Sequence, residues 1–221
     1  MNEQDILQAL YDETLVGNAP RVLELTNEAL ELHMEPQSLL FDALIPSLEE
    51  VGARFERGDF FVPEMLIAGR AMAGAMAVLR PLLAETGVQT IGKFLMGTVK
   101  GDVHDIGKNL VNIMLEGAGF NVIDLGVQVA PEKFADAIVE HKPDIVGFSA
   151  FLTTTMPMFK ANLNVLQKAG LRDSVIVMVG GAPVTQEYAD AVGADAYAAD
   201  ASATVKKAKD LIARKRAAVP V

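Results

Sequence analysis

The spacing of apolar positions changes character near residue 90. Up to residue 86, apolar side chains recur every three or four residues, which is the period of an amphipathic helix. This pattern predicts four helices, over residues 5–16, 19–32, 36–56 and 62–85. Short connections separate them, so we expect a small helical bundle. Pro46 lies within the third helix and is expected to kink or split it, because proline lacks an amide hydrogen.

Beyond residue 90, short apolar runs alternate with amphipathic stretches. The runs cover residues 94–99, 122–125, 145–148 and 175–179, with a weaker one at 195–198. Helix-like segments begin at Ile106, Pro131, Thr154 and Thr185, and a last one covers residues 201–216. Strands that alternate with helices form a doubly wound parallel sheet. We therefore predict an α plus α/β protein: a four-helix bundle at residues 1–86, a linker at 87–91 and a five-stranded Rossmann-like domain at 92–221.

Composition limits the classes of function. The 221 residues are 51% hydrophobic and include no cysteine, so disulfides, thiolate metal sites and iron–sulfur clusters are excluded. The apolar runs are shorter than a membrane span, and the N-terminus lacks the pattern of a signal peptide. We expect a cytoplasmic protein without a membrane partner.

The negative charge is confined to one part of the chain. Residues 1–88 carry fifteen acidic residues and five arginines, whereas the remainder carries fourteen of each sign. An acidic surface repels phosphate backbones, so we expect no nucleic-acid partner. Two interpretations remain open, a solvated surface that aids solubility and a docking face for partner proteins.

The loop that follows the first predicted strand is the first candidate site. Ligands of doubly wound sheets bind beyond the carboxyl ends of the strands, and this strand ends at Val99. Asp102 and His104 are two residues apart, so an extended loop places both side chains on one side. The carboxylate can accept a proton from one imidazole nitrogen and leave the other free for a metal. Gly101 and Gly107 allow the backbone to approach a bulky ligand.

Other interpretations compete for the same loop. A single histidine in a loop is commonly only an exposed or hydrogen-bonding residue. A Gly-Asp-x-His run also opens the metal site of metallophosphoesterases, but those sites need further histidines, and only His33 and His141 are available, neither in a matching motif. The phosphate-binding motifs Gly-x-x-x-x-Gly-Lys-[Ser/Thr] and Gly-x-Gly-x-x-Gly are both absent, so nucleotide binding is not supported.

Motifs farther along the chain complete a longer pattern. Asp102-x-His104-x-x-Gly107 is followed by Ser149-Ala150-Phe151 and then by Gly180-Gly181. In residue type and spacing this resembles the fingerprint of the cobalamin-binding domain shared by methionine synthase, several mutases and the small corrinoid methyltransferase proteins. The resemblance covers residues 90–217. The family usually has leucine where this chain has Phe151.

The resemblance implies a role for each matching residue. His104 would be the lower axial ligand of cobalt in place of dimethylbenzimidazole, Asp102 would accept its proton, and Thr155 would complete the relay with a hydroxyl. The residues implied in cofactor contact comprise the rest of the loop, the slot for the displaced nucleotide tail and the end of that slot: Gly101, Val103, Asp105, Gly107, Ser149, Phe151, Thr153, Gly180, Gly181 and Ala201. The larger ring of Phe151 is expected to narrow the slot or shift the base.

Residues 51–65 resemble the helical cap found in methionine synthase and in corrinoid methyltransferase proteins. In that cap an aromatic and an aliphatic residue, seven apart, cover the methyl-bearing face of the corrin. Phe55 and Val62 hold these positions, with valine where leucine is usual. The alternative is that both are core residues of the bundle. The cap would have to swing away for methyl transfer, and residues 84–91 would form the hinge.

The cap and the cobalamin motif together resemble the corrinoid shuttles of methylamine, methanol and aryl-ether methyltransferase systems. Such a protein binds cobalamin or a related corrinoid and alternates between methylcobalamin and cob(I)alamin. The implied partners are a substrate-specific methyltransferase, a second methyltransferase that passes the methyl group to a thiol or tetrahydrofolate, and a reductive activation protein. The chain would be a carrier subunit rather than a self-sufficient enzyme. The alternative is a cobalamin sensor or storage protein without methyl transfer.

Overall fold

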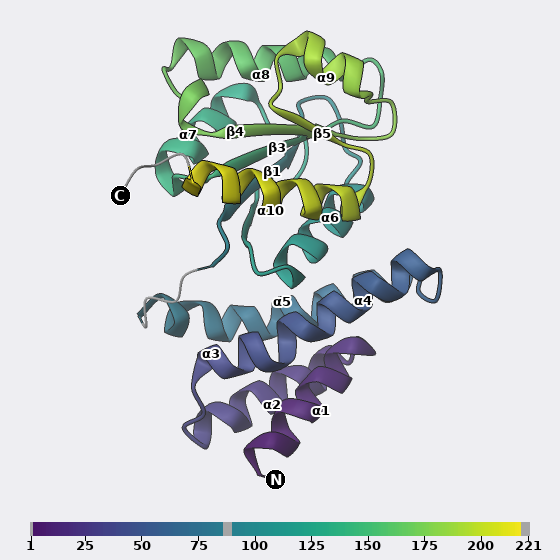
Figure 1. Ribbon diagram of the computed structural model, residues 1–221, viewed down its shortest axis with the longest axis vertical. Helices are drawn as coiled ribbons and strands as arrows, with labels where there is room; N and C mark the ends of the chain where they lie inside the picture. Colours follow the sequence, from purple (N-terminus) through teal and green to yellow (C-terminus); the bar gives the residue numbers. More distant parts are fainter. Residues whose placement is uncertain (1, 86–89, 218–221) are drawn as a thin grey trace. The chain divides into compact units, whose positions relative to one another are not determined.

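The computed structural model describes residues 2–85 and 90–217. Contacts divide the chain into two compact units (Figure 1). Unit 1 comprises Met1–Gln89 and Glu116–Gly119, and unit 2 comprises Thr90–Leu115 and Phe120–Val221. Most of the linker predicted at residues 87–91 lies outside the described residues, so its role as a hinge stays a prediction.

Unit 1 is helical throughout its described part. Its helices are α1 (Glu3–Leu15), α2 (Ala19–Glu31), α3 (Pro36–Ser38), the π-helical η1 (Leu39–Leu44), α4 (Ile45–Arg57) and α5 (Val62–Glu85). Helix α1 begins with a capping box, in which the side chains of Asn2 and Asp5 accept each other's backbone N–H groups. The buried side chains of the helices meet in an apolar core that includes Ile6, Leu10, Val22, Leu25, Leu44, Val51, Met65 and Met72.

The third predicted helix is disturbed as its proline requires. Helix α3 passes directly into the π-helical segment η1, and α4 begins one residue before Pro46. Because proline cannot donate to a carbonyl of the preceding turn, a wider turn at that point costs less than it would elsewhere. Pro46 therefore changes the winding of the helix rather than breaking it.

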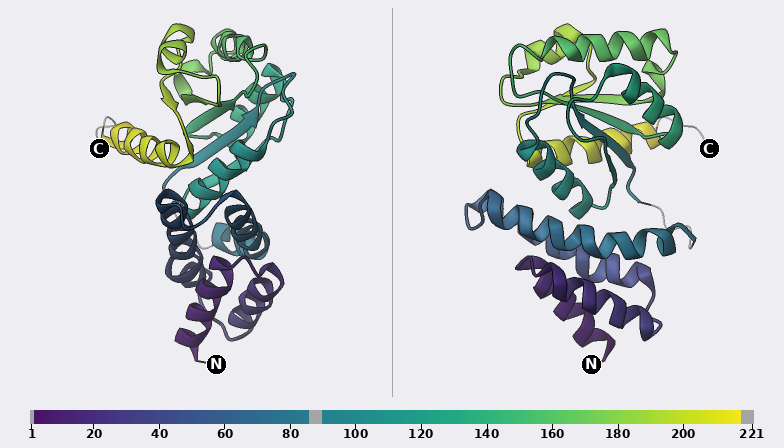
Figure 2. Two further views of the ribbon diagram at one scale, coloured as in Figure 1. Left: turned by 90° about the vertical axis from the view of Figure 1, so that its right-hand side faces the viewer. Right: turned by 180° about the vertical axis from the view of Figure 1, so that it is seen from behind.

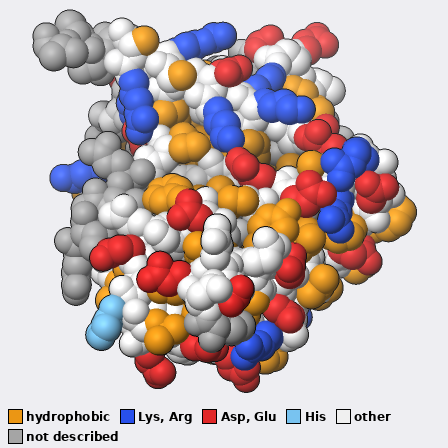
Figure 3. All heavy atoms as spheres, turned by 60° about the horizontal axis from the view of Figure 1, so that its bottom comes forward, with side chains coloured by type: hydrophobic (Ala, Val, Ile, Leu, Met, Phe, Trp, Pro, Cys, Tyr) orange, Lys and Arg blue, Asp and Glu red, His pale blue; other side chains and the backbone are white. Residues whose placement is uncertain are grey.

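Helix α5 is the most apolar helix among the described residues. The segment Val62–Leu83 has a mean hydropathy of 1.4, so by length and composition it could cross a membrane. Its buried side chains, among them Met65, Met72 and Leu79, belong to a helix that packs against α2, α4 and α1. A core helix of a helical unit meets the same criterion. In residues 1–88 carboxylates outnumber basic side chains. Figure 3 shows many acidic side chains on one face of the molecule.

Unit 2 contains a five-stranded parallel sheet with the strand order β2-β1-β3-β4-β5. The strands are β1 (Lys93–Thr98), β2 (Asn121–Asp124), β3 (Ile145–Ser149), β4 (Ile176–Gly180) and β5 (Ala196–Ala198). The helices are α6 (Ile106–Gly117), α7 (Pro131–His141), α8 (Pro157–Lys168), α9 (Gln186–Val192) and α10 (Ala201–Ala217), with the short 3-10 helix η2 (Arg172–Ser174). This confirms the α plus α/β prediction. The helix predicted from Thr154 begins later, at Pro157, whose fixed φ suits a first helical position.

Helices cover both faces of the sheet. Helices α7, α8 and α9 lie on one face, and α6 and α10 lie on the other (Figure 2). Phe134, Phe148 and Phe159 are central to the apolar core of the first face, and their rings are in contact. At Gly147 an added Cβ would meet the Met96 sulfur and the edge of the Phe94 ring, so a larger residue in the middle strand would force these buried side chains to shift. The packed layers hold the carboxyl ends of β1 and β3 side by side.

Candidate functional site

The strand order locates the switch point of the sheet between β1 and β3, since the chain continues to β2 on one side and to β4 on the other. The register pairs Thr98 with Ser149, Ser149 with Gly180, and Gly180 with Ala198. These residues therefore form one row at the carboxyl edge of the sheet. The His104 loop follows β1, and the segment with Phe151 follows β3. The two motifs, distant in sequence, meet at the switch point.

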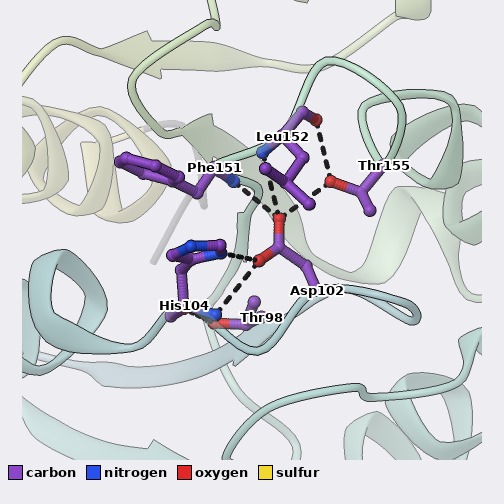
Figure 4. Close-up of polar contacts among 6 residues, drawn as sticks. All are labelled: Thr98, Asp102, His104, Phe151, Leu152 and Thr155. Carbon is purple, nitrogen blue, oxygen red and sulfur yellow. Dashed lines mark hydrogen bonds and ion pairs between the residues drawn. The ribbon is translucent and has the colours of Figure 1, made fainter.

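Asp102 is the centre of the polar network at this edge (Figure 4). Its side chain is fully buried. Oδ1 accepts from the His104 amide at 3.1 Å and lies 2.8 Å from His104 Nδ1. Oδ2 accepts from the Phe151 amide at 2.7 Å, the Leu152 amide at 3.2 Å and the Thr155 hydroxyl at 2.8 Å. The predicted contacts of Asp102 with His104 and Thr155 are both present.

These donors keep Asp102 ionised despite its burial. Burial alone favours the neutral acid, but hydrogen bonds from His104, Phe151 and Thr155 stabilise the anion more, so the pKa of Asp102 lies well below its usual range. An ionised carboxylate can only accept hydrogen bonds. The short contact therefore places a proton on Nδ1 of His104, so the neutral form of the imidazole has its lone pair on Nε2. A neutral imidazole in this tautomer is a metal ligand.

The backbone of the loop is held from the end of β1. The buried Thr98 hydroxyl donates to the His104 carbonyl oxygen at 2.9 Å, and the Gln128 amide donates to the Asp102 carbonyl oxygen at 3.0 Å. Gly101 has a φ of +84°, a conformation that glycine adopts without strain. Sequence analysis missed Thr98. The available signal was a single hydroxyl at the end of an otherwise apolar strand.

An ion pair between a buried lysine and an exposed aspartate beside the loop was also missed. Lys108, in the first turn of α6, has a side chain only 1% exposed, and its Nζ lies 2.5 Å from Oδ2 of Asp124. The other oxygen of Asp124 accepts from the Gly126 amide at 2.9 Å, and the Gly126 carbonyl accepts from the Thr98 amide at 3.0 Å. The pair thus connects α6 with the end of β2 and, through Gly126, with Thr98 at the end of β1.

His104 and several exposed apolar side chains lie at the same edge of the sheet. The His104 side chain is 45% exposed, and its ring stacks on that of Phe151 with the centroids 4.4 Å apart. The large apolar residues exposed in the loops after β1, β2 and β3 are Val103, Ile106, Val127, Phe151 and Leu152. A single imidazole donor among exposed apolar side chains suits a metal that carries its other ligands in a flat organic macrocycle.

The residues predicted for the nucleotide tail are distributed along the same edge. Ser149 and Gly180 are direct neighbours, Thr153 is exposed in the turn before α8, and Ala201 is buried at the start of α10. At Gly181 the φ is +133°, and an added Cβ would lie 1.8 Å from the Ala150 carbonyl oxygen. The close approach of two backbones thus requires this glycine in the chain itself. That Gly180 and Gly181 also make room for a tail stays a prediction.

The two predicted cap residues belong to unit 1. Phe55 lies in the last turn of α4, and Val62 is the first residue of α5. Between them Gly58 closes α4 in the left-handed conformation, with a φ of +80°. Both side chains are partly exposed, so neither is fully buried in the core of the bundle, and their contact with a cofactor stays a prediction.

Comparison with known proteins indicates which cofactor the chain binds. Two sequence families, each described as a B12 binding domain, match residues 92–208 and residues 6–80. The dimethylamine corrinoid protein of Methanosarcina barkeri is 42% identical over 214 residues, which cover 96% of this chain and all of that protein. Trimethylamine corrinoid protein 2 of Methanosarcina mazei is 42% identical over 201 residues, 90% of this chain and 89% of the relative.

Solved structures agree with the sequence relatives. The methanol:cobalamin methyltransferase complex MtaBC of Methanosarcina barkeri matches with a TM-score of 0.85 and 28% identity, over 96% of this chain and 81% of the matched one. A cobalamin-binding protein of Desulfitobacterium hafniense matches with a TM-score of 0.66 and 30% identity, over 93% of this chain and 98% of that protein.

Fold, site and comparisons together define a cobalamin-binding protein, in which a helical domain precedes a Rossmann-like B12-binding domain. The chain belongs to the family of corrinoid proteins that includes the dimethylamine and trimethylamine corrinoid proteins.

Proposed function

We propose that this chain is a corrinoid methyl carrier, which holds cobalamin at His104 and passes a methyl group from one methyltransferase to another. The observation that carries the proposal is the buried Asp102 carboxylate on Nδ1 of His104, which leaves Nε2 free at the carboxyl edge of the sheet. The corrinoid proteins that resemble the chain over nearly its whole length support the carrier role.

Each residue of the site has a separate role in this proposal. Bound cobalamin supplies the chemistry, because its cobalt can accept a methyl group and release it. His104 would hold the cobalt through Nε2, and Asp102 holds the proton on the opposite nitrogen. The Thr155 hydroxyl and the amides of Phe151 and Leu152 fix the carboxylate, so the strength with which it holds that proton tunes the imidazole as a donor.

The helical unit completes the site in this proposal. Phe55 and Val62 cover the methyl-bearing face of the cofactor and move away when a methyltransferase docks. The support is the sequence resemblance to a cap, together with the partial exposure of both side chains at the corner between α4 and α5. Residues 84–91 serve as the hinge, and residues 86–89 among them lie outside the described part of the chain.

The partners follow from the relatives. The chain is 42% identical to a dimethylamine corrinoid protein and to a trimethylamine corrinoid protein, so the donor enzyme in this proposal is a methylamine methyltransferase. A second methyltransferase passes the methyl group to a thiol or tetrahydrofolate, and a reductive activation protein restores the reactive cofactor. We place these steps in the cytoplasm, without a membrane or nucleic acid as partner.

Methyl transfer separates a carrier from a cobalamin sensor or storage protein. The chain is loaded with cobalamin, reduced, and mixed with a purified dimethylamine methyltransferase and dimethylamine, and the visible spectrum is followed. A carrier becomes methylated at a rate that depends on the enzyme. Phe41→Leu, an exposed site in η1, is the matched control for preparation and loading. If the loaded protein is methylated with none of the mono-, di- and trimethylamine enzymes, the methylamine donor is wrong, and if the methanol and aryl-ether enzymes also fail, the carrier role is wrong.

A further inference from the structure

The ring of Phe151 lies on the imidazole of His104. The ring centroids are 4.4 Å apart, and the planes are inclined by 26° (Figure 4). The Phe151 side chain remains half exposed. It therefore contributes little to the core, and its main aromatic contact is the histidine.

The backbone holds this phenylalanine in place. The Phe151 amide donates to Oδ2 of Asp102 at 2.7 Å, and the neighbouring Leu152 amide donates to the same oxygen at 3.2 Å. The following turn is closed by hydrogen bonds from the amides of Thr155 and Met156 to the Leu152 carbonyl, at 3.0 Å and 3.3 Å. One carboxylate thus fixes both the histidine ring and the main chain that carries the phenylalanine ring.

The two contacts on His104 restrain different motions. The hydrogen bond at Nδ1 acts in the plane of the imidazole and still allows the ring to tilt about that bond. The stacked ring contacts the face of the imidazole and opposes the tilt. Offset stacking of two rings contributes beyond the area it buries, and an ordered ring loses less freedom when a ligand binds. A leucine at position 151 can touch the imidazole but cannot stack on it.

We propose that Phe151 is a positioning residue for the cobalt ligand: by stacking on His104 it holds the imidazole in the orientation that presents Nε2, before any cofactor is bound. The inference rests on the proposed role of His104 as the lower ligand and adds a residue to that role. In this inference, the function of the Phe151 side chain is to orient His104.

The first test needs no cofactor. In the unloaded chain, the ring current of Phe151 shifts the proton resonances of the His104 imidazole. Phe151→Leu and Phe151→Ala should abolish this shift, Phe151→Tyr should keep it, and Phe41→Leu, the same change at another exposed phenylalanine, should leave it intact. Imidazole resonances that are unchanged in Phe151→Ala would overturn the stack.

The second test measures coordination. Each variant is titrated with methylcobalamin, and the fraction of bound cofactor coordinated by His104 is read from the visible spectrum. A stacking contribution of this kind corresponds to a roughly two- to tenfold lower coordination constant in Phe151→Ala, with Phe151→Tyr close to the unaltered chain. The melting temperature should not change, because the side chain is half exposed.

The outcomes separate this inference from the proposed function. If His104→Ala loses coordination while Phe151→Ala coordinates as well as the unaltered chain, the positioning role is wrong and the ligand assignment stands. If His104→Ala coordinates normally, the ligand assignment itself is wrong. Tighter coordination in Phe151→Ala would show that the ring obstructs the site, which also overturns the inference.

Discussion

Asp102→Asn tests how the carboxylate controls the imidazole, because it changes one atom and keeps the shape of the side chain. In the structure Oδ1 accepts hydrogen bonds from the amide and Nδ1 of His104. Oδ2 accepts hydrogen bonds from the amides of Phe151 and Leu152 and from the Thr155 hydroxyl. Asparagine has one acceptor oxygen and one amino group, so it can satisfy only one of these two sets.

The number of backbone N–H groups left without an acceptor decides the orientation of the asparagine side chain. If the asparagine oxygen faces Phe151, Leu152 and Thr155, only the His104 amide loses its acceptor. In the reverse orientation, the amides of both Phe151 and Leu152 lose theirs. Each unsatisfied buried donor costs about 1–3 kcal/mol, which favours the first orientation. Three bonds to a neutral oxygen replace three bonds to an anion, each weaker by about 0.5 kcal/mol. The free energy of unfolding should therefore fall by about 2.5–4.5 kcal/mol.

In that orientation the amino group faces Nδ1, so the imidazole proton moves to Nε2 and the lone pair is lost for coordination. Nitrogen-15 NMR of the unloaded, histidine-labelled chain reports the tautomer at a pH where the imidazole is neutral. The chain has three histidines, and His104→Ala assigns the resonances. Thr155→Val removes one donor but keeps the carboxylate, so its tautomer should match that of the unaltered chain. A proton that remains on Nδ1 in Asp102→Asn would refute this reasoning.

Two further pairs of variants test the frame around the site by urea unfolding. Asp124→Ala leaves the buried Lys108 ammonium with the side-chain oxygen of Asn109 as its hydrogen-bond acceptor and should cost about 2 kcal/mol. Lys108→Met removes the buried charge and should cost less, about 1 kcal/mol, even though Lys108 is the more buried partner. Equal losses would contradict the argument from burial. Gly181→Ala places a Cβ 1.8 Å from the Ala150 oxygen at a φ of +133° and should cost more than about 3 kcal/mol. Gly193→Ala, at a φ of +85° with open space around it, should cost only about 1 kcal/mol, and a similar loss in both would exclude backbone contact as the cause.

Local patterns in the sequence predict the elements and part of the site. The apolar periods locate the strands and most helices to within a few residues, because burial on a sheet or a helix face imposes them. Asp102 and His104 are two residues apart, so the loop alone brings them together. Thr155 was found through a family resemblance, since no local rule connects it with a residue about fifty positions earlier.

Contacts across the sheet could not be predicted in the same way. The bonds of Asp102 to the amides of Phe151 and Leu152 depend on the register of β1 and β3, and a backbone amide leaves no mark in the sequence. The stacking of Phe151 on His104 and the pairing of Lys108 with Asp124 likewise join separate strands and loops. Residue type permits many partners for such side chains, and only tertiary packing selects one.

The account depends most on His104 as the nitrogen ligand of cobalt. The chain is produced with nitrogen-15 histidine, loaded with unlabelled cobalamin and reduced to the paramagnetic cobalt(II) form for electron paramagnetic resonance. Nitrogen-15 has a nuclear spin of one half and the nitrogen-14 of the cofactor's own base has a spin of one, so the axial nitrogen splits the signal into doublets or triplets. We expect doublets that disappear in His104→Ala. Triplets in the labelled chain would show that the cofactor keeps its own base and that His104 is not the ligand.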